Sequence, residues 1–220
     1  MTRDVPIQWA PNENVVGRLA GEPSNASIGV LLAHGAGAGQ GHPFMEAVRD
    51  GLAAAGLPTM TFDYAYTAAG RKAPDRTAKL LAVHRAAADA LADMTAAVVL
   101  AGKSMGGRVG SHLVGDEGWP AAGVVFLGYP LVPMGKREPR DTAHLTRIEV
   151  PQLFVAGSRD RLGPLPLIEP LVAALADAEL MVVDDGDHSL RVTKAAARTD
   201  AEVLAGVVAA IAAWIRRRIG

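Results

Sequence analysis

The sequence has no cysteine, few aromatic residues and almost no excess charge. The absence of cysteine excludes disulfides, thiolate metal sites and cysteine nucleophiles. The formal net charge of the 220 residues is −1, so no basic excess points to a nucleic acid or to an anionic membrane surface. We therefore expect neither a nucleic acid nor a membrane as a partner.

A long uninterrupted apolar stretch is also missing. The longest run, Val203 to Ile215, has 13 residues and is too short to span a bilayer. The N-terminus carries Arg3, Asp4 and Pro6 with no apolar segment behind them, which argues against a signal peptide. We expect a soluble cytoplasmic protein. No histidines or carboxylates stand at a recognised metal-ligand spacing, so we expect no metal and no other cofactor.

What the sequence does contain is a regular alternation of apolar strand-length runs and helical patterns. Half of the residues are hydrophobic, which is enough for a sizeable core. The pattern predicts strands at 3–9, 14–20, 28–33, 57–62, 98–101, 121–127, 152–156 and 179–183, and helices at 43–56, 75–91, 105–114, 167–176 and 200–218, with Asp75 capping the second helix. Continuous apolar strands belong to sheets that are covered on both faces. We predict a single α/β domain over residues 1–220, with three α/β/α layers, a mostly parallel central sheet and no cap domain.

One strand runs directly into the sequence Gly102-Lys103-Ser104-Met105-Gly106. A serine between small residues, at a sharp turn from a buried strand to a helix, is typical of a nucleophile elbow. Gly102-Lys103-Ser104 also ends a phosphate-binding loop, but that loop requires a glycine where Ala97 stands. The glycines after residue 34 do not have the spacing of a dinucleotide-binding fingerprint.

The residues that follow each strand predict where the chemistry lies, because ligands of open α/β sheets bind at the carboxyl ends of the strands. Ser104, Asp160 and His188 each follow a different strand, in that order along the chain. His188 would accept the Ser104 proton, and Asp160 would orient the imidazole. Asp184, Asp185 and Asp187 are rival acids, but they are near neighbours of His188 in the sequence.

A developing oxyanion needs two fixed hydrogen-bond donors. We expect one to be the backbone N–H of Met105, at the start of the helix after the serine. The second is expected from the glycine-rich turn after residue 33, with the Ala36 N–H as the best candidate.

Together these segments resemble the α/β-hydrolase superfamily, and within it the small lidless proteins similar to testis-expressed protein 30 and to relatives of dienelactone hydrolase. The resemblance covers roughly residues 28–218, and its motifs lie at 34–45, 70–76, 102–108, 128–131, 157–160 and 187–189. It implies a triad of Ser104, Asp160 and His188, but it implies no substrate. From the triad we expect a serine hydrolase, of the carboxylesterase type, that acts on a small ester or thioester through an acyl-enzyme. Dienelactone hydrolases themselves use cysteine where this chain has Ser104. The alternative is a catalytically silent binding or scaffold protein with the same fold.

The substrate side of the site is less well defined by the sequence. Possible substrate-lining residues are His34, Gly35, His42, Tyr64, Lys103, Arg140 and His144, whereas His84 and His112 are expected to be structural. Cations cluster in the same loops, namely Arg71, Lys72, Lys136 and Arg137 with Arg140 and Lys103. They would favour an anionic ester, or they are ordinary solvated charges. The sequence leaves open whether the protein is a monomer or a homodimer.

Overall fold

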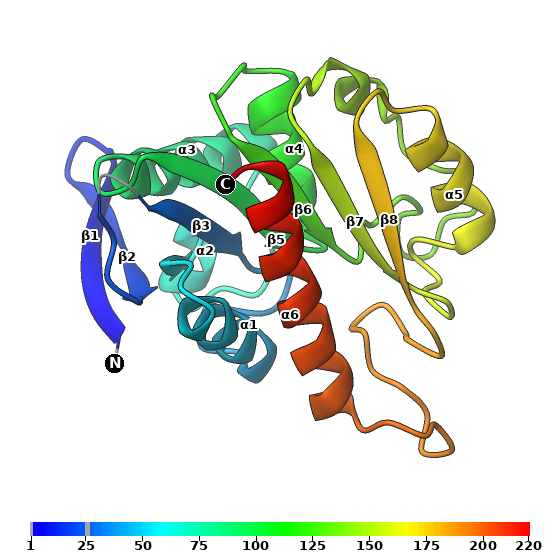
Figure 1. Ribbon diagram of the computed structural model, residues 1–220. Helices are drawn as coiled ribbons and strands as arrows, with labels where there is room; N and C mark the ends of the chain where they lie inside the picture. The colour runs from blue at the N-terminus through cyan, green and yellow to red at the C-terminus, as the bar shows by residue number, and fades with distance from the viewer. Residues whose placement is uncertain (1, 25–26) are drawn as a thin grey trace.

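The computed structural model describes residues 2–24 and 27–220, and in this part of the chain eight strands form one sheet. Their order across the sheet is β1-β2-β4-β3-β5-β6-β7-β8 (Figure 1). The strands are β1 (Thr2–Ala10), β2 (Glu13–Ala20), β3 (Ile28–Ala33), β4 (Thr59–Phe62), β5 (Ala97–Lys103), β6 (Gly123–Leu127), β7 (Gln152–Gly157) and β8 (Ala178–Val183). β1 and β2 are antiparallel, as are β2 and β4, and every other pair is parallel. The predicted mostly parallel sheet is confirmed.

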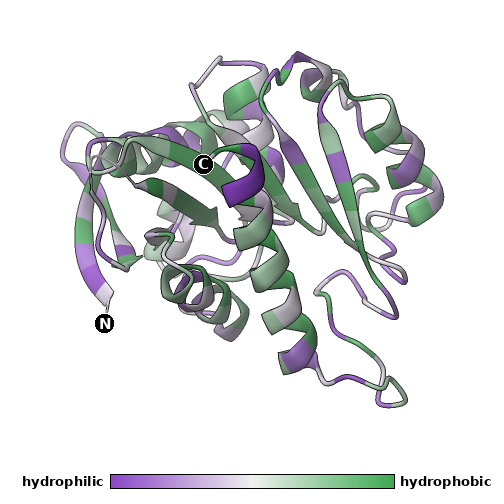
Figure 2. Ribbon diagram, in the orientation of Figure 1, coloured by the Kyte–Doolittle hydropathy of each residue, from purple (hydrophilic) through white to green (hydrophobic). Residues whose placement is uncertain are grey.

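Helices cover both faces of this sheet, which gives the predicted three layers (Figure 1). They are α1 (Pro43–Ala54), α2 (Ala65–Ala68), α3 (Thr77–Ala92), α4 (Met105–Gly115), the 3-10 helix η1 (Ala143–Arg147), α5 (Leu165–Ala173) and α6 (Asp200–Arg218). One core joins the sheet to α1 and α6, and the core on the opposite face joins it to α3, α4 and α5. The central strands read as continuously apolar because they are buried on both sides (Figure 2).

The sequence patterns locate most elements to within a few residues, but one predicted helix start is wrong. Asp75 does not cap α3, because Arg76 occupies the N-cap position and Asp75 instead accepts a 2.7 Å hydrogen bond from Arg71. The short helix α2 lies between the predicted strand at 57–62 and the predicted helix at 75–91, where the sequence pattern indicates neither a strand nor a helix. By contrast, α6 begins at Asp200 as predicted, with a capping box formed by Thr199 and Glu202.

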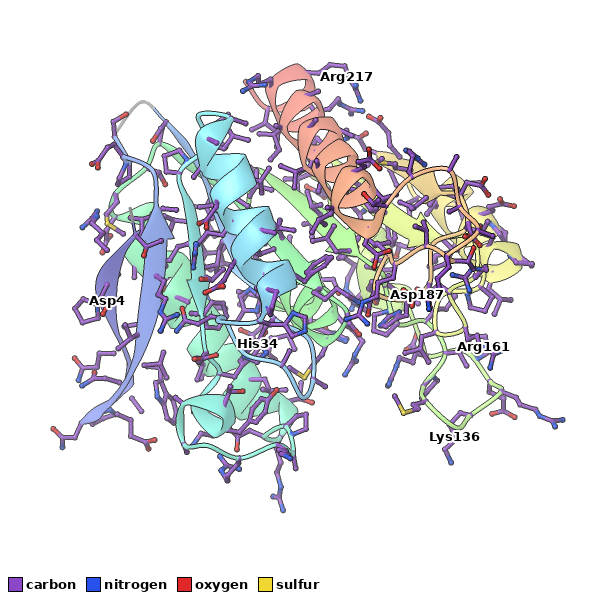
Figure 3. All side chains as sticks on the ribbon, turned by 90° about the horizontal axis from the view of Figure 1, so that it is seen from below. Asp4, His34, Lys136, Arg161, Asp187 and Arg217 are labelled. Carbon is purple, nitrogen blue, oxygen red and sulfur yellow. The ribbon has the colours of Figure 1, made fainter. Side chains whose placement is uncertain are left out.

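The longest helix, α6, has 19 residues and ends in three arginines, Arg216 to Arg218. Within the described residues, none of the helices combines the length and the apolar character that a bilayer crossing requires. In Figure 1 the C-terminal ends of β7 and β8 point downward, and Figure 3 views the molecule from that side. The predicted site residues follow the strands at this end.

Candidate active site

Ser104 stands on the turn between β5 and α4, in a backbone conformation that is unfavourable for a residue with a side chain. Its φ is 51° and its ψ is −113°. Its backbone N–H donates to the Leu127 carbonyl on the neighbouring strand at 3.1 Å. Such strain persists only where the surrounding structure enforces it. The turn therefore has the geometry of the predicted elbow, with the serine at its tip.

Glycines make this turn possible because the strand and the helix pass very close to one another. A Cβ atom added at Gly102 would lie 2.2 Å from the Gly107 nitrogen. One added at Gly106 would lie 2.4 Å from the Ala33 carbonyl oxygen. Real Cβ atoms do not approach backbone atoms so closely, so both positions require glycine. The small residues that flank the serine in the sequence are explained by these contacts.

A continuous chain of side-chain contacts joins the serine to a base and an acid. His188 Nε2 lies 2.8 Å from Ser104 Oγ, and His188 Nδ1 lies 2.8 Å from Asp160 Oδ2. A carboxylate can only accept, so Nδ1 carries the ring proton and Nε2 is free to accept from the serine hydroxyl. The three residues follow β5, β7 and β8, and the structure brings them together in the arrangement predicted from their order.

Asp160 is held as a buried anion. Burial alone would raise its pKa, but hydrogen bonds from His188 and from the Leu162 and Gly163 N–H groups outweigh burial and lower that pKa. The rival Asp187 accepts from the backbone N–H groups of Ser189 and Arg191 instead. Asp160 is therefore the carboxylate that contacts His188.

The two backbone segments predicted to hold an oxyanion both adjoin Ser104. Met105 is the first residue of α4, and the first N–H groups of a helix have no partner within it. The turn that contains Ala36 lies on the other side, where a Cβ added at Gly35 would be 3.5 Å from the Ser104 Cβ. Gly37 in this turn has a φ of 72°, a left-handed conformation that glycine adopts without steric cost. The assignment of the Met105 and Ala36 N–H groups as donors stays a prediction.

Lys103, directly before the serine, extends beneath the site. Its Nζ donates a 2.6 Å hydrogen bond to the His188 carbonyl oxygen. Burial lowers the pKa of this ammonium to about 8, although the nearby carboxylates of Asp160 and Asp187 oppose the effect. Lys103 thus links the strand that leads to Ser104 with the loop that carries His188.

Ser104 and His188 open into a cavity of about 1060 Å³. Besides these two, four more of the predicted site residues line it, namely Gly35, Ala36, His42 and Lys103. The His42 Nδ1 also accepts from the Phe44 N–H at 3.1 Å and so caps α1. Among the described residues, no group of three or more histidines or carboxylates is arranged to hold a metal ion.

The prediction that His34 and Tyr64 line the site needs correction, because both side chains are fully buried. The His34 Nε2 accepts from the Tyr64 backbone N–H, and its Nδ1 lies 2.8 Å from the Gly35 carbonyl oxygen. The Tyr64 hydroxyl lies 2.9 Å from His84 Nδ1. Burial lowers the pKa of His84 to about 3, so this histidine is neutral. These polar aromatic side chains form part of the core instead of a substrate surface.

The predictions for His144 and Arg140 are also corrected, because neither residue is among those that line the cavity. His144 is buried, and its Nε2 lies 2.9 Å from Ser111 Oγ, while its ring stacks on His112 at 3.7 Å between centroids. The Arg140 Nε donates to the Pro130 carbonyl at 3.1 Å. Lys136, labelled in Figure 3, lies on an outlying loop. In the described chain, none of the predicted loop cations except Lys103 lies on the cavity wall.

Sequence reasoning missed much of the apolar wall. Met134 stands at the cavity with 85% of its surface exposed, and Leu162 follows the acid loop. Further parts of this wall come from α1 with its C-cap and from α6, through Ala47, Gly51, Ala55, Leu204, Ala205 and Ala209. The spacing of four residues between small side chains in both helices is the signal that indicates such a wall.

The sequence matches the family model described as an alpha/beta hydrolase domain over residues 26–216. This segment includes Ser104, Asp160 and His188. It also includes strands β3 to β8, and it leaves out only the N-terminal hairpin of β1 and β2 from the described sheet.

Several solved structures are similar along almost the whole chain. Dienelactone hydrolase from Anabaena variabilis is 21% identical, with a TM-score of 0.76 over 100% of this chain and 99% of that one. The esterase domain of a Rhodothermus marinus protein is 18% identical, with a TM-score of 0.75 over 100% of both chains. A lidless serine hydrolase from Xanthomonas campestris is 13% identical, with a TM-score of 0.74 over 99% of this chain and 95% of that one. At these identities the likeness concerns the fold, which in this chain has no cap domain.

Proposed function

The chain belongs to the α/β hydrolase family, and from this premise we propose that it is a serine hydrolase that cleaves a small carboxylic ester or thioester. The observation that carries the proposal is the chain of two 2.8 Å contacts from Ser104 Oγ through His188 to Asp160, at the strained tip of the elbow. A scaffold protein has no need to hold a serine in a strained conformation against a base that is itself oriented by a buried anion.

The reaction begins when Ser104 Oγ attacks the carbonyl carbon and its proton passes to His188 Nε2. The carbonyl oxygen becomes an oxyanion, which the backbone N–H groups of Met105 and Ala36 would stabilise. Asp160 stabilises the imidazolium that forms and keeps the ring in the required tautomer.

The tetrahedral intermediate collapses when His188 returns its proton to the departing alcohol or thiol. The acyl group then remains as an ester on Ser104. In the second half of the reaction, His188 takes a proton from water, and the resulting hydroxide attacks the acyl-enzyme. The carboxylic acid leaves, and the proton held by His188 restores the Ser104 hydroxyl.

The test is the hydrolysis of p-nitrophenyl acetate by the purified protein. We expect a measurable kcat that Ser104→Ala and His188→Ala reduce to near background. Asp160→Asn should lower kcat by about 10⁴-fold, because it stabilises the wrong tautomer. Ser24→Ala, which changes an exposed serine in a distant turn, is the matched control and should retain full activity. Hydrolysis by the Ser104→Ala protein at the wild-type rate would refute the proposal.

A further inference from the structure

The cavity at Ser104 continues as a groove between α1 and α6, which lie side by side on one face of the sheet (Figure 1). We call it the α1–α6 groove and define it by Ala47, Gly51, Ala55, Leu204, Ala205 and Ala209. The N-terminal ends of both helices lie near the site, since His42, Pro43 and Asp200 also line the same cavity. A molecule bound at the serine can therefore extend along the groove.

Small side chains keep this groove open. Ala47, Gly51 and Ala55 recur every four residues and so share one face of α1. The helices meet at the bottom of the groove, where a Cβ added at Gly51 would lie 2.8 Å from Val208 Cγ1. The exposed Ala47 and Ala205 leave space that longer side chains would fill. From Ala47 to Ala55 the groove runs for about 12 Å, at 1.5 Å per residue.

The six groove residues carry no charged or hydrogen-bonding side chain. The charged residues that line the cavity lie outside this set of six, and two of them already make hydrogen bonds to the backbone. Lys103 donates to the His188 carbonyl, and Asp200 accepts from the Val192 N–H. Such a surface gains free energy from an alkyl or aromatic group but offers nothing to a charged one.

We propose that the α1–α6 groove binds the acyl chain of the substrate, which makes the protein selective for esters of medium-length apolar acids. This inference rests on the function proposed above. His188 must protonate the departing group, so the alcohol lies on the His188 side of Ser104. The acyl chain then extends on the opposite side of Ser104, past the turn at Gly35 and Ala36. The polypeptide continues from this turn through His42 into α1, so this side of the site adjoins the groove.

The experiment compares p-nitrophenyl octanoate with p-nitrophenyl acetate, which differ only in the acyl chain. We expect a higher kcat/KM for the octanoate, since each methylene fully removed from water favours it by about fourfold. Ala205→Trp fills the groove from α6, and Ala47→Glu places a charge on the facing wall. Each should lower the octanoate kcat/KM by about tenfold or more and change the acetate value by less than about twofold.

Ala213→Trp is the matched control, because Ala213 is exposed on the same helix and does not line the cavity. It should leave both substrates unchanged. The groove assignment would be overturned if the wild-type kcat/KM were equal for octanoate and acetate, or if both groove variants kept the wild-type octanoate kcat/KM. In either case Ser104-dependent acetate hydrolysis would persist, so the proposed function would stand. A preference for octyl acetate over ethyl acetate that Ala205→Trp abolishes would also overturn it, by giving the groove to the alcohol. If the wild-type protein did not hydrolyse p-nitrophenyl acetate at all, that result would instead count against the proposed function.

A second inference comes from the independent contact beneath the site. Lys103 Nζ donates to the carbonyl of the very residue that supplies the base, at 2.6 Å. The space for this contact exists because position 128 is glycine. A Cβ added there would lie 2.8 Å from the His188 carbonyl oxygen and 3.3 Å from Lys103 Nζ. The ammonium thus holds the His188 backbone directly from the residue before the nucleophile.

We infer that Lys103 is a positioning residue, which keeps His188 Nε2 against Ser104 Oγ during turnover. This too rests on the proposed function. The titratable groups around its ammonium are His188, Asp160 and Asp187, and the two carboxylates partly offset the cost of burying its charge. The contact is strongest while Lys103 is protonated, and burial brings the pKa of the ammonium to about 8.

The test measures p-nitrophenyl acetate hydrolysis by Lys103→Met and Lys103→Arg across the pH range, with Lys136→Met as the control on an exposed loop. Lys103→Met should lower kcat by about tenfold or more with KM nearly unchanged, since a misplaced base affects the chemical step. The wild-type kcat/KM should decline above about pH 8, and this decline should disappear in Lys103→Met and shift upward in Lys103→Arg. A merely structural role leaves the pH profile unchanged, and that result, or a wild-type kcat in Lys103→Met, would overturn the inference.

Discussion

The close approach of α4 to β3 at Gly106 provides a quantitative test of the elbow. Gly106→Ala would place a Cβ 2.4 Å from the Ala33 carbonyl oxygen and 2.7 Å from that of His34. The first is a backbone atom at the end of the buried central strand β3, and the second belongs to the buried residue that follows it, so neither can move without disturbing the sheet. Overpacking of this kind costs about 1–3 kcal/mol of unfolding free energy.

Gly206 is the matched control, because it also lies inside a helix, but no atom of residues 2–24 and 27–220 beyond its own surroundings in that helix lies within 4 Å of an added Cβ. There alanine removes the entropic penalty of glycine and should stabilise the protein by about 0.5–1 kcal/mol. The two substitutions are chemically identical, so the difference of about 1.5–4 kcal/mol between them separates the packing at the elbow from the general effect of replacing a helical glycine.

Urea unfolding followed by circular dichroism measures both variants. We expect the midpoint to fall for Gly106→Ala and to rise for Gly206→Ala, with similar slopes. For a domain of this size, each kcal/mol corresponds to about 2–4 °C in Tm. A Gly106→Ala protein at least as stable as the wild type would refute the packing described here, and with it the physical reason for the position of Ser104.

Three further predictions follow from buried or capping contacts. Tyr64→Phe should cost about 1–3 kcal/mol of unfolding free energy, because it removes the hydroxyl that contacts the buried His84. Tyr66→Phe should be neutral or stabilising, because the Tyr66 hydroxyl is buried and has no hydrogen-bond partner among the residues that the structure describes. Urea unfolding of both variants checks this. Thr199→Ala should cost about 1 kcal/mol by removing the capping box of α6, as thermal unfolding would show. The lowered pKa of Asp160 means that its ionised form stabilises the fold above the unfolded pKa of about 3.9, and that this stability is lost as the pH falls through the lower folded value. Urea unfolding at acid and neutral pH should therefore show a larger acid loss for the wild type than for Asp160→Asn.

The parts of the fold that depend on local signals could be predicted from the sequence. Continuous apolar runs mark the buried strands, and the small residues at Gly102 and Gly106 mark the elbow, because each is a direct consequence of burial or close approach. Asp160 could be preferred over Asp187 from strand order alone, and the structure places Asp160 against His188. By contrast, Asp75 did not predict the start of α3 correctly. Its carboxylate accepts a hydrogen bond from the Arg71 side chain and does not cap the helix.

The direction in which loop side chains point could not be predicted. His34 and Tyr64 stand just after strand ends, and His144 lies in the long connection between β6 and β7. Each of the three side chains nevertheless turns into the core, where it contacts other buried polar groups. The groove was missed for a different reason. Its two walls, α1 and α6, are separated by more than half of the chain, so neither sequence pattern alone indicates that the small faces meet.

Covalent labelling with a fluorophosphonate, read by intact mass and by peptide mapping, tests directly whether Ser104 is an activated nucleophile. We expect one adduct per chain on Ser104, with no appreciable labelling of Ser104→Ala or His188→Ala protein, because the hydroxyl reacts only when His188 accepts its proton. An unlabelled wild-type protein, an adduct on another residue, or intact labelling after His188→Ala would contradict the assignment of Ser104 as a nucleophile activated by His188.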